Sequence, residues 1–361
     1  MSDILVIGGG VIGLLTAREL AEAGAGVTLV EMGETGREAS WAGGGIISPL
    51  YPWRYADSVT ALSLWGQRAY PDLCARLREE TGIDPEHIRT GLLILDQEEH
   101  EQALTWAETH GVPIEVVDGD SLRNAEPALG PQPERALLLP EVAQVRNPRL
   151  TKALRRSIEK RVQIREQEEV IEILVEKDRT VGVRTQRGTA AADKVVICTG
   201  AWTAKLLEQL GRTPDILPVR GQIIMFYAKP DLVNHVVLYR DRYVIPRKDG
   251  RILIGSTLED TGFVKATTAE AKEDLYRTAV EIVPLLKRTP IEDHWAGLRP
   301  GSPSGIPYIG AYPGIGGLYV NAGHFRNGLV TGPASARLVT NLLLDRAPFT
   351  DPAPYALDAS R

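Results

Sequence analysis

Cysteine and histidine are scarce in this sequence of 361 residues, which contains two cysteines and six histidines. Cys74 and Cys198 lie in apolar surroundings, and no spacing typical of metal ligands is found around them. We therefore predict that both are buried thiols of an intracellular protein and not parts of a disulfide framework. The histidines form no HxxxH pattern and no Cys/His cluster, so we predict that the protein has no metal site.

Long apolar runs are also missing from the sequence. No stretch approaches the roughly 18 apolar residues that a membrane-spanning helix requires. The apolar N-terminal segment ILVIGGGVIGLL has no basic leader and is interrupted by three glycines, which argues against a signal peptide. We therefore expect no membrane association and a cytoplasmic location.

An excess of positive charge is absent as well, because the formal net charge is −6. This charge, together with the lack of a basic arm, argues against a nucleic-acid partner. Residues 155–165, RRSIEKRVQIR, are locally basic, but EQEE follows directly, and we interpret the segment as a solvated helix face. The chain is long enough for two lobes that share an extensive core.

The first 32 residues carry the clearest pattern. A short apolar strand, DILVIG, leads into a GxGxxG turn at Gly8, Gly10 and Gly13. A helix is predicted from Val11, and a second strand, VTLVEM, ends near Glu31. This order of strand, glycine turn, helix and strand, with an acid at the end of the second strand, predicts a dinucleotide-binding unit.

Each of these residues has a physical task in such a unit. Gly8 permits the tight turn, Gly10 lets the backbone approach a pyrophosphate, and Gly13 lets the helix pack closely on the sheet. The free N–H groups at the helix N-terminus suit phosphate. The carboxylate of Glu31 can accept hydrogen bonds from the ribose hydroxyls, and it would repel a 2′-phosphate.

The segment REASWAGGGI, residues 37–46, favours FAD over NAD. Ser40 and the run Gly43, Gly44 and Gly45 would bring backbone N–H groups close to a large ligand. A flexible loop is the alternative interpretation.

The remaining segments predict a mixed fold. Helices are expected at 60–80, 97–111, 146–161 and 268–284, and strands at 91–96, 114–118, 168–176, 180–186 and 195–198. The last of these strands runs into Thr199 and Gly200, a strand end that would return to the nucleotide. An antiparallel sheet with a hairpin turn at 248–250 is predicted from four alternating segments, QIIMFY, HVVLY, RYVIPR and RILIGST.

The predicted fold class is α/β, or mixed α+β, with two domains. A discontinuous, Rossmann-like FAD-binding domain is expected to comprise residues 1–84, 146–217 and 296–361. A substrate-binding domain with an antiparallel or mixed sheet, residues 85–145 and 218–295, is inserted between these segments.

Several motifs in their order along the chain resemble the D-amino-acid oxidase family of FAD-dependent enzymes. They are the GxGxxG unit with Glu31, the Ser40–Gly45 loop, VVICTGAW, YVIPRKDGRILIGST, HWAGLRPGSPSGIPYIG and NAGHFRNGLVTGPASA. The resemblance spans nearly the whole chain. Within the family, the chain looks most like the branch that oxidises glycine and serves thiazole assembly in thiamine biosynthesis.

The resemblance implies a non-covalent FAD whose flavin ring lies where the two domains meet. It also implies oxidative deamination of glycine, sarcosine and small D-amino acids, including D-alanine and D-proline. A hydride would pass from the α-carbon to flavin N5, and O2 would then reoxidise the flavin. The products would be hydrogen peroxide, an oxo acid such as glyoxylate, and ammonia or an amine. A homo-oligomer, a dimer or a tetramer, is implied as well.

The resemblance assigns roles to individual residues of this sequence. Arg299 would grip the substrate carboxylate, Tyr243 would lie near it, and Arg326 would be a second arginine at the substrate. The remaining matches are positions that touch FAD: Val11, Ile12, Glu31, Met32, Gly43, Gly44, Gly45, Val170, His324, Phe325, Arg326, Asn327, Gly328, Leu329 and Val330.

Without the resemblance, these residues have more ordinary interpretations. Arg299, which follows a packed run and enters a loop rich in Gly, Pro and Ser, would be a solvated surface arginine. Tyr243 would be a packing residue of its strand. His324 is interpreted as a backbone contributor to the flavin pocket, not as a catalytic base. The helix expected to start near Pro333 could direct its positive end at the negative charge that develops on the flavin.

Two departures from the family pattern concern substrate preference. Residues 51–55, YPWRY, are unusually aromatic where the family has a variable loop over the active site, and they are expected to reshape its entrance. Leu258 stands where a methionine is usual in the glycine-oxidising branch. Trp202 and Trp295 are interpreted as core aromatics.

Three alternatives stay open at the level of the sequence. An FAD-dependent dehydrogenase for secondary amines or D-amino acids would pass its electrons to a carrier other than O2. A covalent-flavin oxidase is disfavoured, because LRPGSP has no cysteine and residues 40–43 include no histidine. A non-catalytic FAD-binding protein is the third.

Overall fold

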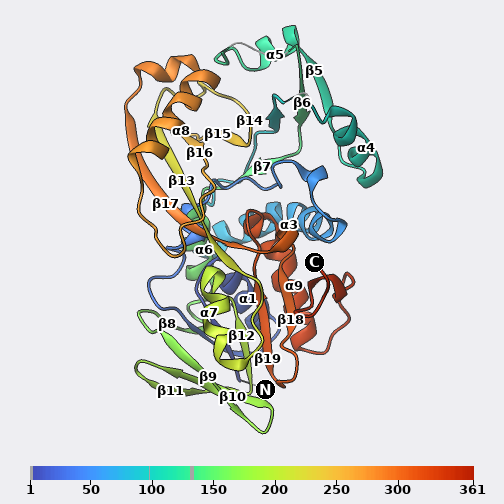
Figure 1. Cartoon of the computed structure of the whole chain (residues 1–361), viewed down its shortest axis with the longest axis vertical. Helices are drawn as coiled ribbons and strands as arrows, with labels where there is room; N and C mark the ends of the chain where they lie inside the picture. The colour runs from blue at the N-terminus through green and yellow to red at the C-terminus, as the bar shows by residue number, and fades with distance from the viewer. Residues whose placement is uncertain (1–2, 97, 131–133) are drawn as a thin grey trace.

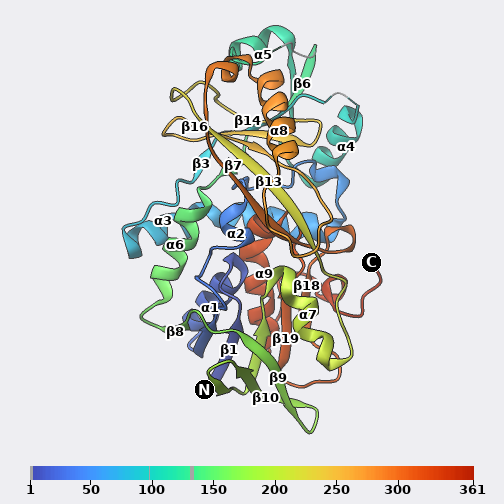
Figure 2. The ribbon, with the colours of Figure 1, turned by 60° about the vertical axis from the view of Figure 1, so that its left-hand side comes forward.

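Two large sheets lie at opposite ends of an elongated molecule, as the computed structural model shows (Figures 1 and 2). The structure describes residues 3–96, 98–130 and 134–361. Helices surround the sheet that contains the N-terminal strand, and this mixed α/β architecture confirms the predicted fold class.

The N-terminal strands form the centre of a six-stranded sheet. Its order is β18 (Tyr308–Ala311), β19 (Leu318–Ala322), β12 (Lys194–Ile197), β1 (Asp3–Ile7), β2 (Gly26–Val30) and β8 (Val162–Arg165). All neighbouring strands are parallel except β18 and β19. The apolar runs of β1, β2 and β12 are buried on both faces, which explains why they read as continuous rather than alternating.

Strand β8 corrects the interpretation of residues 155–165. The helix α6 (Asn147–Ile158) ends earlier than expected, and the chain turns at 159–161 into β8 on the sheet edge. Val162 is buried against the core, whereas Lys160 and Arg161 in the turn are exposed. A run of four residues with charges on both sides is too short for its period to reveal a strand.

The second sheet has eight strands and is mostly antiparallel. Its order is β17 (Ile291–Gly301), β13 (Leu217–Tyr227), β16 (Arg251–Gly255), β15 (Arg242–Pro246), β14 (Val236–Tyr239), β4 (Leu92–Ile94), β6 (Arg135–Leu139) and β5 (Glu115–Asp118). The predicted antiparallel group and its hairpin at 248–250 are confirmed. Only β14 and β4 pair in parallel within this sheet, among the described residues.

The helices and the small sheets complete the described structure. Besides α6, the α-helices are α1 (Val11–Glu22), α2 (Ala39–Ala42), α3 (Asp57–Thr81), α4 (His100–His110), α5 (Gly119–Ala125), α7 (Thr203–Leu207), α8 (Ala269–Ile282) and α9 (Gly328–Leu343). The small sheets pair β3 (Ile88–Arg89) with β7 (Ala143–Gln144), and β9 (Val170–Glu176) and β11 (Gly188–Ala191) with β10 (Arg179–Thr185). Residue 97, the first of the helix expected at 97–111, lies outside the described residues.

The aromatic segment at 51–55 packs differently from the expectation. Tyr51 and Trp53 are buried in the core beneath the second sheet, and the Tyr51 hydroxyl donates to Asp96 at 2.7 Å. The segment does not line the main cavity described below. The proposed domain boundary at 295/296 falls within β17, so the division into domains stays a prediction.

Both cysteines are free and buried, as predicted. Burial raises the pKa of each thiol, Cys74 and Cys198, to about 12, which makes both inert at neutral pH.

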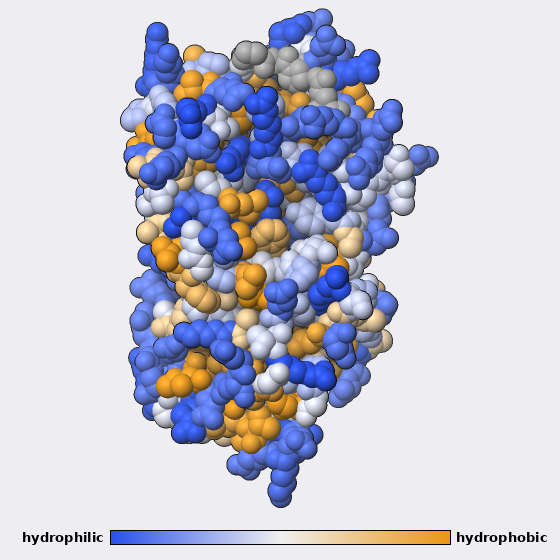
Figure 3. Space-filling model, viewed as in Figure 1, coloured by the Kyte–Doolittle hydropathy of each residue, from blue (hydrophilic) through white to orange (hydrophobic). Residues whose placement is uncertain are grey.

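No helix in the described part of the chain is long and apolar enough to span a membrane. On the face seen in Figure 3, hydrophilic residues dominate, and the hydrophobic ones form separate patches.

Glu166 ties the end of β8 to two other segments. Its carboxylate accepts hydrogen bonds from the backbone N and the hydroxyl of Thr35, at 2.9 and 2.7 Å, and from Arg155 at 2.9 Å. The hydrogen bond from Arg155, supported by those from Thr35, lowers the pKa of Glu166 to about 2.

We predict that Glu166→Gln lowers the unfolding midpoint near pH 7 by about 1–3 °C, because this partly exposed network contributes about 1 kcal/mol. A carboxyl group with a depressed folded pKa stabilises the fold above its unfolded pKa near 4.5. The difference between variant and wild type should therefore shrink as the pH falls from about 4.5 to 2, as measured by thermal denaturation. Glu172→Gln, in an exposed pair with Arg184, is the control and should change the midpoint little at any pH. A difference that persists at pH 2 would contradict the assignment.

Candidate active site

A cavity of about 530 Å³ lies between the two sheets. Residues at the carboxyl ends of β1, β2 and β12 line one side of it, and residues of β15 and β17 line the other. The carboxyl edge of a parallel sheet is where open α/β folds bind their ligands.

The glycine turn after β1 has the close contacts that the pattern predicts. Gly8 has a φ of +102°, and a Cβ there would lie 2.4 Å from the carbonyl oxygen of Cys198. A Cβ on Gly13 would lie 1.8 Å from the carbonyl oxygen of Gly8. Gly13 therefore allows α1 to pack closely on the turn, although it does not itself line the cavity.

Backbone donors hold Glu31 at the end of β2. One carboxylate oxygen accepts from the N–H of Gly9 at 2.6 Å, and the other accepts from the N–H of Gly33 at 2.9 Å. Burial raises the pKa of Glu31, and these two hydrogen bonds oppose the shift. Each oxygen keeps a further lone pair that can accept from a ribose hydroxyl.

Ser40 reaches the N-terminus of α1 from the loop expected to contact FAD. Its hydroxyl accepts from the N–H of Val11 at 2.8 Å, and its carbonyl oxygen accepts from the Asn147 side chain at 2.8 Å. The residues around Ser40 form the short helix α2, which the sequence did not indicate. The arrangement orders the loop beside the glycine turn.

A buried cation, Arg247, lies behind the three glycines. Its guanidinium donates to the carbonyl oxygens of Gly44 and Val145, at 2.8 and 2.9 Å, and to the side chain of Gln144 at 2.5 Å. Burial lowers the pKa of Arg247 to about 10, so the group is still protonated at neutral pH. All three acceptors are neutral oxygens, one in the glycine loop and two at residues 144–145.

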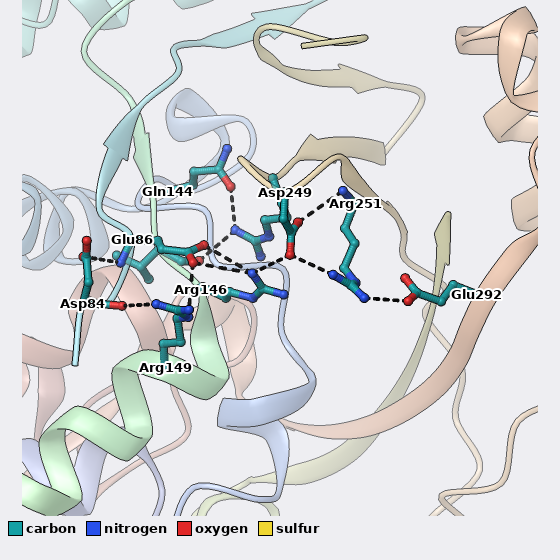
Figure 4. Close-up of polar contacts among 10 residues, drawn as sticks. Asp84, Glu86, Gln144, Arg146, Arg149, Asp249, Arg251 and Glu292 are labelled. Atoms are coloured by element: carbon teal, nitrogen blue, oxygen red, sulfur yellow. Dashed lines mark hydrogen bonds and ion pairs between the residues drawn. The ribbon is translucent and has the colours of Figure 1, made fainter. Parts of the chain in front are cut away.

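Arg146, Glu86 and Asp249 lie near enough to Arg247 to influence its pKa. Figure 4 shows that these three charged residues are paired with one another. Arg146 lies between Glu86 and Asp249, with the Asp249 contact at 2.9 Å. Arg251 continues the chain of ion pairs from Asp249 to Glu292, at 2.8 and 2.6 Å. This network links Arg146 to the second sheet, through Arg251 of β16 and Glu292 of β17.

Arg299 lies on the opposite side of the cavity, in β17 rather than in the expected loop. Its guanidinium donates to the hydroxyl of Ser256 at 2.5 Å and to the carbonyl oxygen of Thr257 at 3.1 Å. Burial, and then the charges of Arg326 and Arg242, lower its pKa, while Tyr243 opposes the shift.

No carboxylate among the described residues forms an ion pair with Arg299 or Arg326. Both arginines line the cavity, so two unpaired cations face the same space. The solvated surface arginine is therefore the wrong interpretation of Arg299.

Two strand glycines provide the space for these side chains. A Cβ on Gly221 of β13 would lie 2.0 Å from a guanidinium nitrogen of Arg299. A Cβ on Gly255 of β16 would lie 2.6 Å from the ring of Tyr243, its partner across the strands. Neither glycine was predicted from the sequence as part of the site. A glycine inside a strand pattern was the available signal, because it often marks a close approach.

The GHFRNG segment differs from the expectation in one respect. Helix α9 begins at Gly328, so Pro333 lies inside the helix and does not start it. The helix starts five residues nearer the N-terminus than expected, and its first turn packs on α3, whose Tyr70 hydroxyl donates to the carbonyl oxygen of Leu329 at 2.8 Å. His324 is buried, its Nε2 lies 3.0 Å from the Ser335 hydroxyl, and burial lowers its pKa to about 3.

Most residues expected to contact FAD line this one cavity. They are Gly8, Gly10, Val11, Ile12, Glu31, Met32, Ser40, Gly43, Gly44, Gly45, Val170, Thr199, Gly200, His324, Phe325, Arg326, Gly328 and Leu329. Asn327 and Val330 are buried beside it, as is Gly13. Trp202, expected in the core, lines the cavity and contacts Phe263 with ring centroids 5.7 Å apart.

The residues present fit a dinucleotide. The glycine turn and the N-terminus of α1 suit a pyrophosphate, and the held carboxylate of Glu31 suits a ribose. The described residues contain no group of three or more His, Cys, Asp or Glu side chains placed to hold a metal ion.

Comparison with known proteins places this architecture in a family. The sequence profile described as FAD dependent oxidoreductase matches residues 3–342. A glycine oxidase of Pseudomonas aeruginosa is 53% identical over 355 residues, which cover 98% of each protein. The bifunctional protein ThiO/ThiG of a Nostoc species is 29% identical over 359 residues, 95% of this chain but 53% of that protein. The crystal structure of a glycine oxidase from Geobacillus kaustophilus has a TM-score of 0.94 at 30% identity and covers 100% of both chains.

Glu31, beside the glycine turn, and Arg299 line the same cavity. The chain that carries both motifs belongs to the FAD-dependent oxidoreductase family.

Proposed function

We propose that this protein oxidises glycine, sarcosine and small D-amino acids, using FAD as cofactor and O2 as the final electron acceptor. The observation that carries the proposal is the unpaired Arg299 in the cavity wall, beside Tyr243 and Arg326. Similarity to the glycine oxidase of Pseudomonas aeruginosa over 98% of both chains supports the same substrate class.

A substrate carboxylate would complete the interactions of Arg299. The planar guanidinium can form two parallel charge-assisted hydrogen bonds to a carboxylate, which also orient it. Ser256 and Thr257 already hold the guanidinium in place, so little side-chain entropy is lost when the substrate binds. Arg326 adds positive charge on the same side of the cavity.

The bound FAD supplies the redox chemistry, because its ring accepts a hydride from the substrate α-carbon. The residues of this chain orient the amino acid and exclude competing reactions. The substrate must react as a free amine. With a pKa of about 3, His324 is too weak a base to take a proton from an ammonium group at neutral pH.

The same proposal includes a role in thiazole assembly for thiamine biosynthesis. It is supported by the likeness of 95% of this chain to about half of a protein named ThiO/ThiG. A homo-oligomer of two or four chains and a cytoplasmic location also stay predictions from the sequence. Light scattering of the purified protein measures how many chains the oligomer contains.

The function is tested with purified FAD-loaded protein. Under anaerobic conditions, we expect glycine, sarcosine, D-alanine or D-proline to bleach the visible absorbance of the bound flavin. In air, the same substrates should consume O2 and produce hydrogen peroxide. Bleaching without peroxide, combined with rapid reduction of an artificial dye, would identify a dehydrogenase instead. Absence of bleaching by every amino acid would indicate a non-catalytic FAD-binding protein.

Arg299→Ala is predicted to retain FAD and to lose activity. Two charge-assisted hydrogen bonds of about 1.5–3 kcal/mol each disappear, so kcat/KM for glycine should fall about 100-fold or more. Arg299→Lys should keep more activity than alanine but less than wild type, because a point charge orients a carboxylate less well. Arg288→Ala, at an exposed position, is the control. Near-normal kcat/KM in Arg299→Ala would exclude the proposed role.

Arg247→Met should weaken FAD binding. The change leaves the carbonyl oxygens of Gly44 and Val145 without their donor, so the glycine loop loses its support. We expect the FAD dissociation constant, measured by flavin fluorescence, to rise about tenfold or more. KM for glycine at saturating FAD should change less. Arg149→Met, on the exposed side of the same network, is the control, and an equal effect there would contradict the assignment.

A further inference from the structure

Two neighbouring residues, Ser256 and Thr257, orient the guanidinium of Arg299. One terminal nitrogen donates to the Ser256 hydroxyl, and the other donates to the carbonyl oxygen of Thr257. Each of these nitrogens carries a second hydrogen, which stays available to a substrate carboxylate. A shift of the Thr257 carbonyl group would therefore turn the donors that face the cavity, and small errors of orientation cost much in binding and rate.

The hydroxyl of Thr257 holds this residue from the side away from the cavity. It accepts from the backbone N–H of Gln222 at 2.9 Å and donates to the carboxylate of Glu259. Thr257 is 6% exposed, so water does not readily replace either partner. None of Thr257, Gln222 and Glu259 lines the cavity, so none of them is placed to contact a substrate there.

Glu259 is itself held by β13. One carboxylate oxygen accepts from the Gln222 side chain at 2.8 Å, and the other accepts from Arg220 at 2.5 and 3.2 Å. The backbones of Arg220 and Glu259 also exchange two hydrogen bonds, at 2.9 and 3.0 Å. Burial by itself would raise the pKa of Glu259, but the hydrogen bonds from Thr257, Arg220 and Gln222 lower it. The carboxylate is therefore charged at neutral pH and remains an acceptor for the Thr257 hydroxyl.

Strand alternation explains why this network lies behind Arg299. Gly221 of β13 lies beneath the Arg299 guanidinium, so both share one face of the sheet. Arg220 and Gln222, the neighbours of Gly221, direct their side chains to the opposite face. Thr257 connects the two faces, because its carbonyl oxygen contacts Arg299 and its hydroxyl belongs to the network on the other side.

We propose that Thr257 and Glu259 are positioning residues for Arg299. The inference rests on the proposed function, in which Arg299 binds the substrate carboxylate. Glu259 fixes the Thr257 hydroxyl, and the Thr257 carbonyl oxygen then holds the guanidinium at the angle that a carboxylate requires. Loss of this support should weaken the binding of carboxylate ligands and leave FAD binding intact.

The inference is tested by titrating the FAD-loaded protein with acetate and following the flavin absorbance. Acetate has the carboxylate of the substrate but no amine to oxidise, so the measurement does not depend on turnover. Thr257→Val keeps the shape of the side chain but lacks the hydroxyl. We expect it to raise the acetate dissociation constant, and KM for glycine, about tenfold, the loss expected for one charge-assisted hydrogen bond. Thr257→Ser keeps the hydroxyl and should match wild type, whereas Arg299→Ala should lose acetate binding.

Thr185→Val is the matched control. The Thr185 hydroxyl accepts from a backbone N–H, that of Arg187, and donates to the carboxylate of Glu168 at 2.8 Å. Thr185 is 4% exposed but belongs to β10, in a different sheet from Arg299. At saturating FAD, Thr185→Val should leave acetate binding unchanged, although it removes the same kind of buried hydroxyl. An equal weakening in this control would contradict a specific role of Thr257.

Wild-type affinity for acetate in Thr257→Val would overturn the inference. Equal losses in Thr257→Ser and Thr257→Val would also overturn it, because they would indicate packing and not the hydroxyl. If Thr257→Val does not fold, Glu259→Ala takes its place, and wild-type acetate affinity in that variant would overturn the inference. Absence of flavin bleaching by every amino acid, with the expected differences in acetate binding, would reject the proposed function and support the positioning of Arg299.

Discussion

The antiparallel pairing of β13 with β17 carries Arg299 to the cavity, and the candidate site depends on it. Val219 lies opposite Arg299 in the register, and Gly221 lies two residues further along β13 on the same face. The missing side chain at Gly221 lets the guanidinium lie across the neighbouring strand. A one-residue slip would turn Arg299 to the other face of the sheet and leave the cavity without its anchor.

Uncompensated positive charge is the second constraint. Arg299, Arg326 and Arg247 all lie at or behind the cavity, and each is held by neutral groups or left without an acidic partner in the described structure. At the other end of the cavity, the carboxylate of Glu31 is held by backbone donors. The cavity therefore has an acceptor end suited to ribose and a cationic end suited to a carboxylate. Unpaired charges that line a cleft are candidates for a functional role.

Much of this arrangement could be predicted from particular residues. The glycine turn, Glu31 and the helix from Val11 are local, since a turn, a period of 3.6 and a strand end lie within 32 consecutive residues. The order of the family motifs along the chain extended the predicted site to Arg299, Tyr243 and Arg326. The sequence did not predict strand β8, the start of α9 or the packing of residues 51–55. In each of these segments packing against a distant element overrides the local pattern, as Tyr51 and Trp53 show when they enter the core of the second sheet.

The sequence by itself therefore determined the dinucleotide unit, the mixed fold class and the kinds of side chain available to the site. Only the tertiary structure decided which of these side chains meet. Gly221 and Gly255 matter because they face Arg299 and Tyr243 across strands, and Arg247 matters because its donors reach Gly44, 203 residues away. Such contacts depend on strand register and on the closure of long loops. No window of neighbouring residues contains that information.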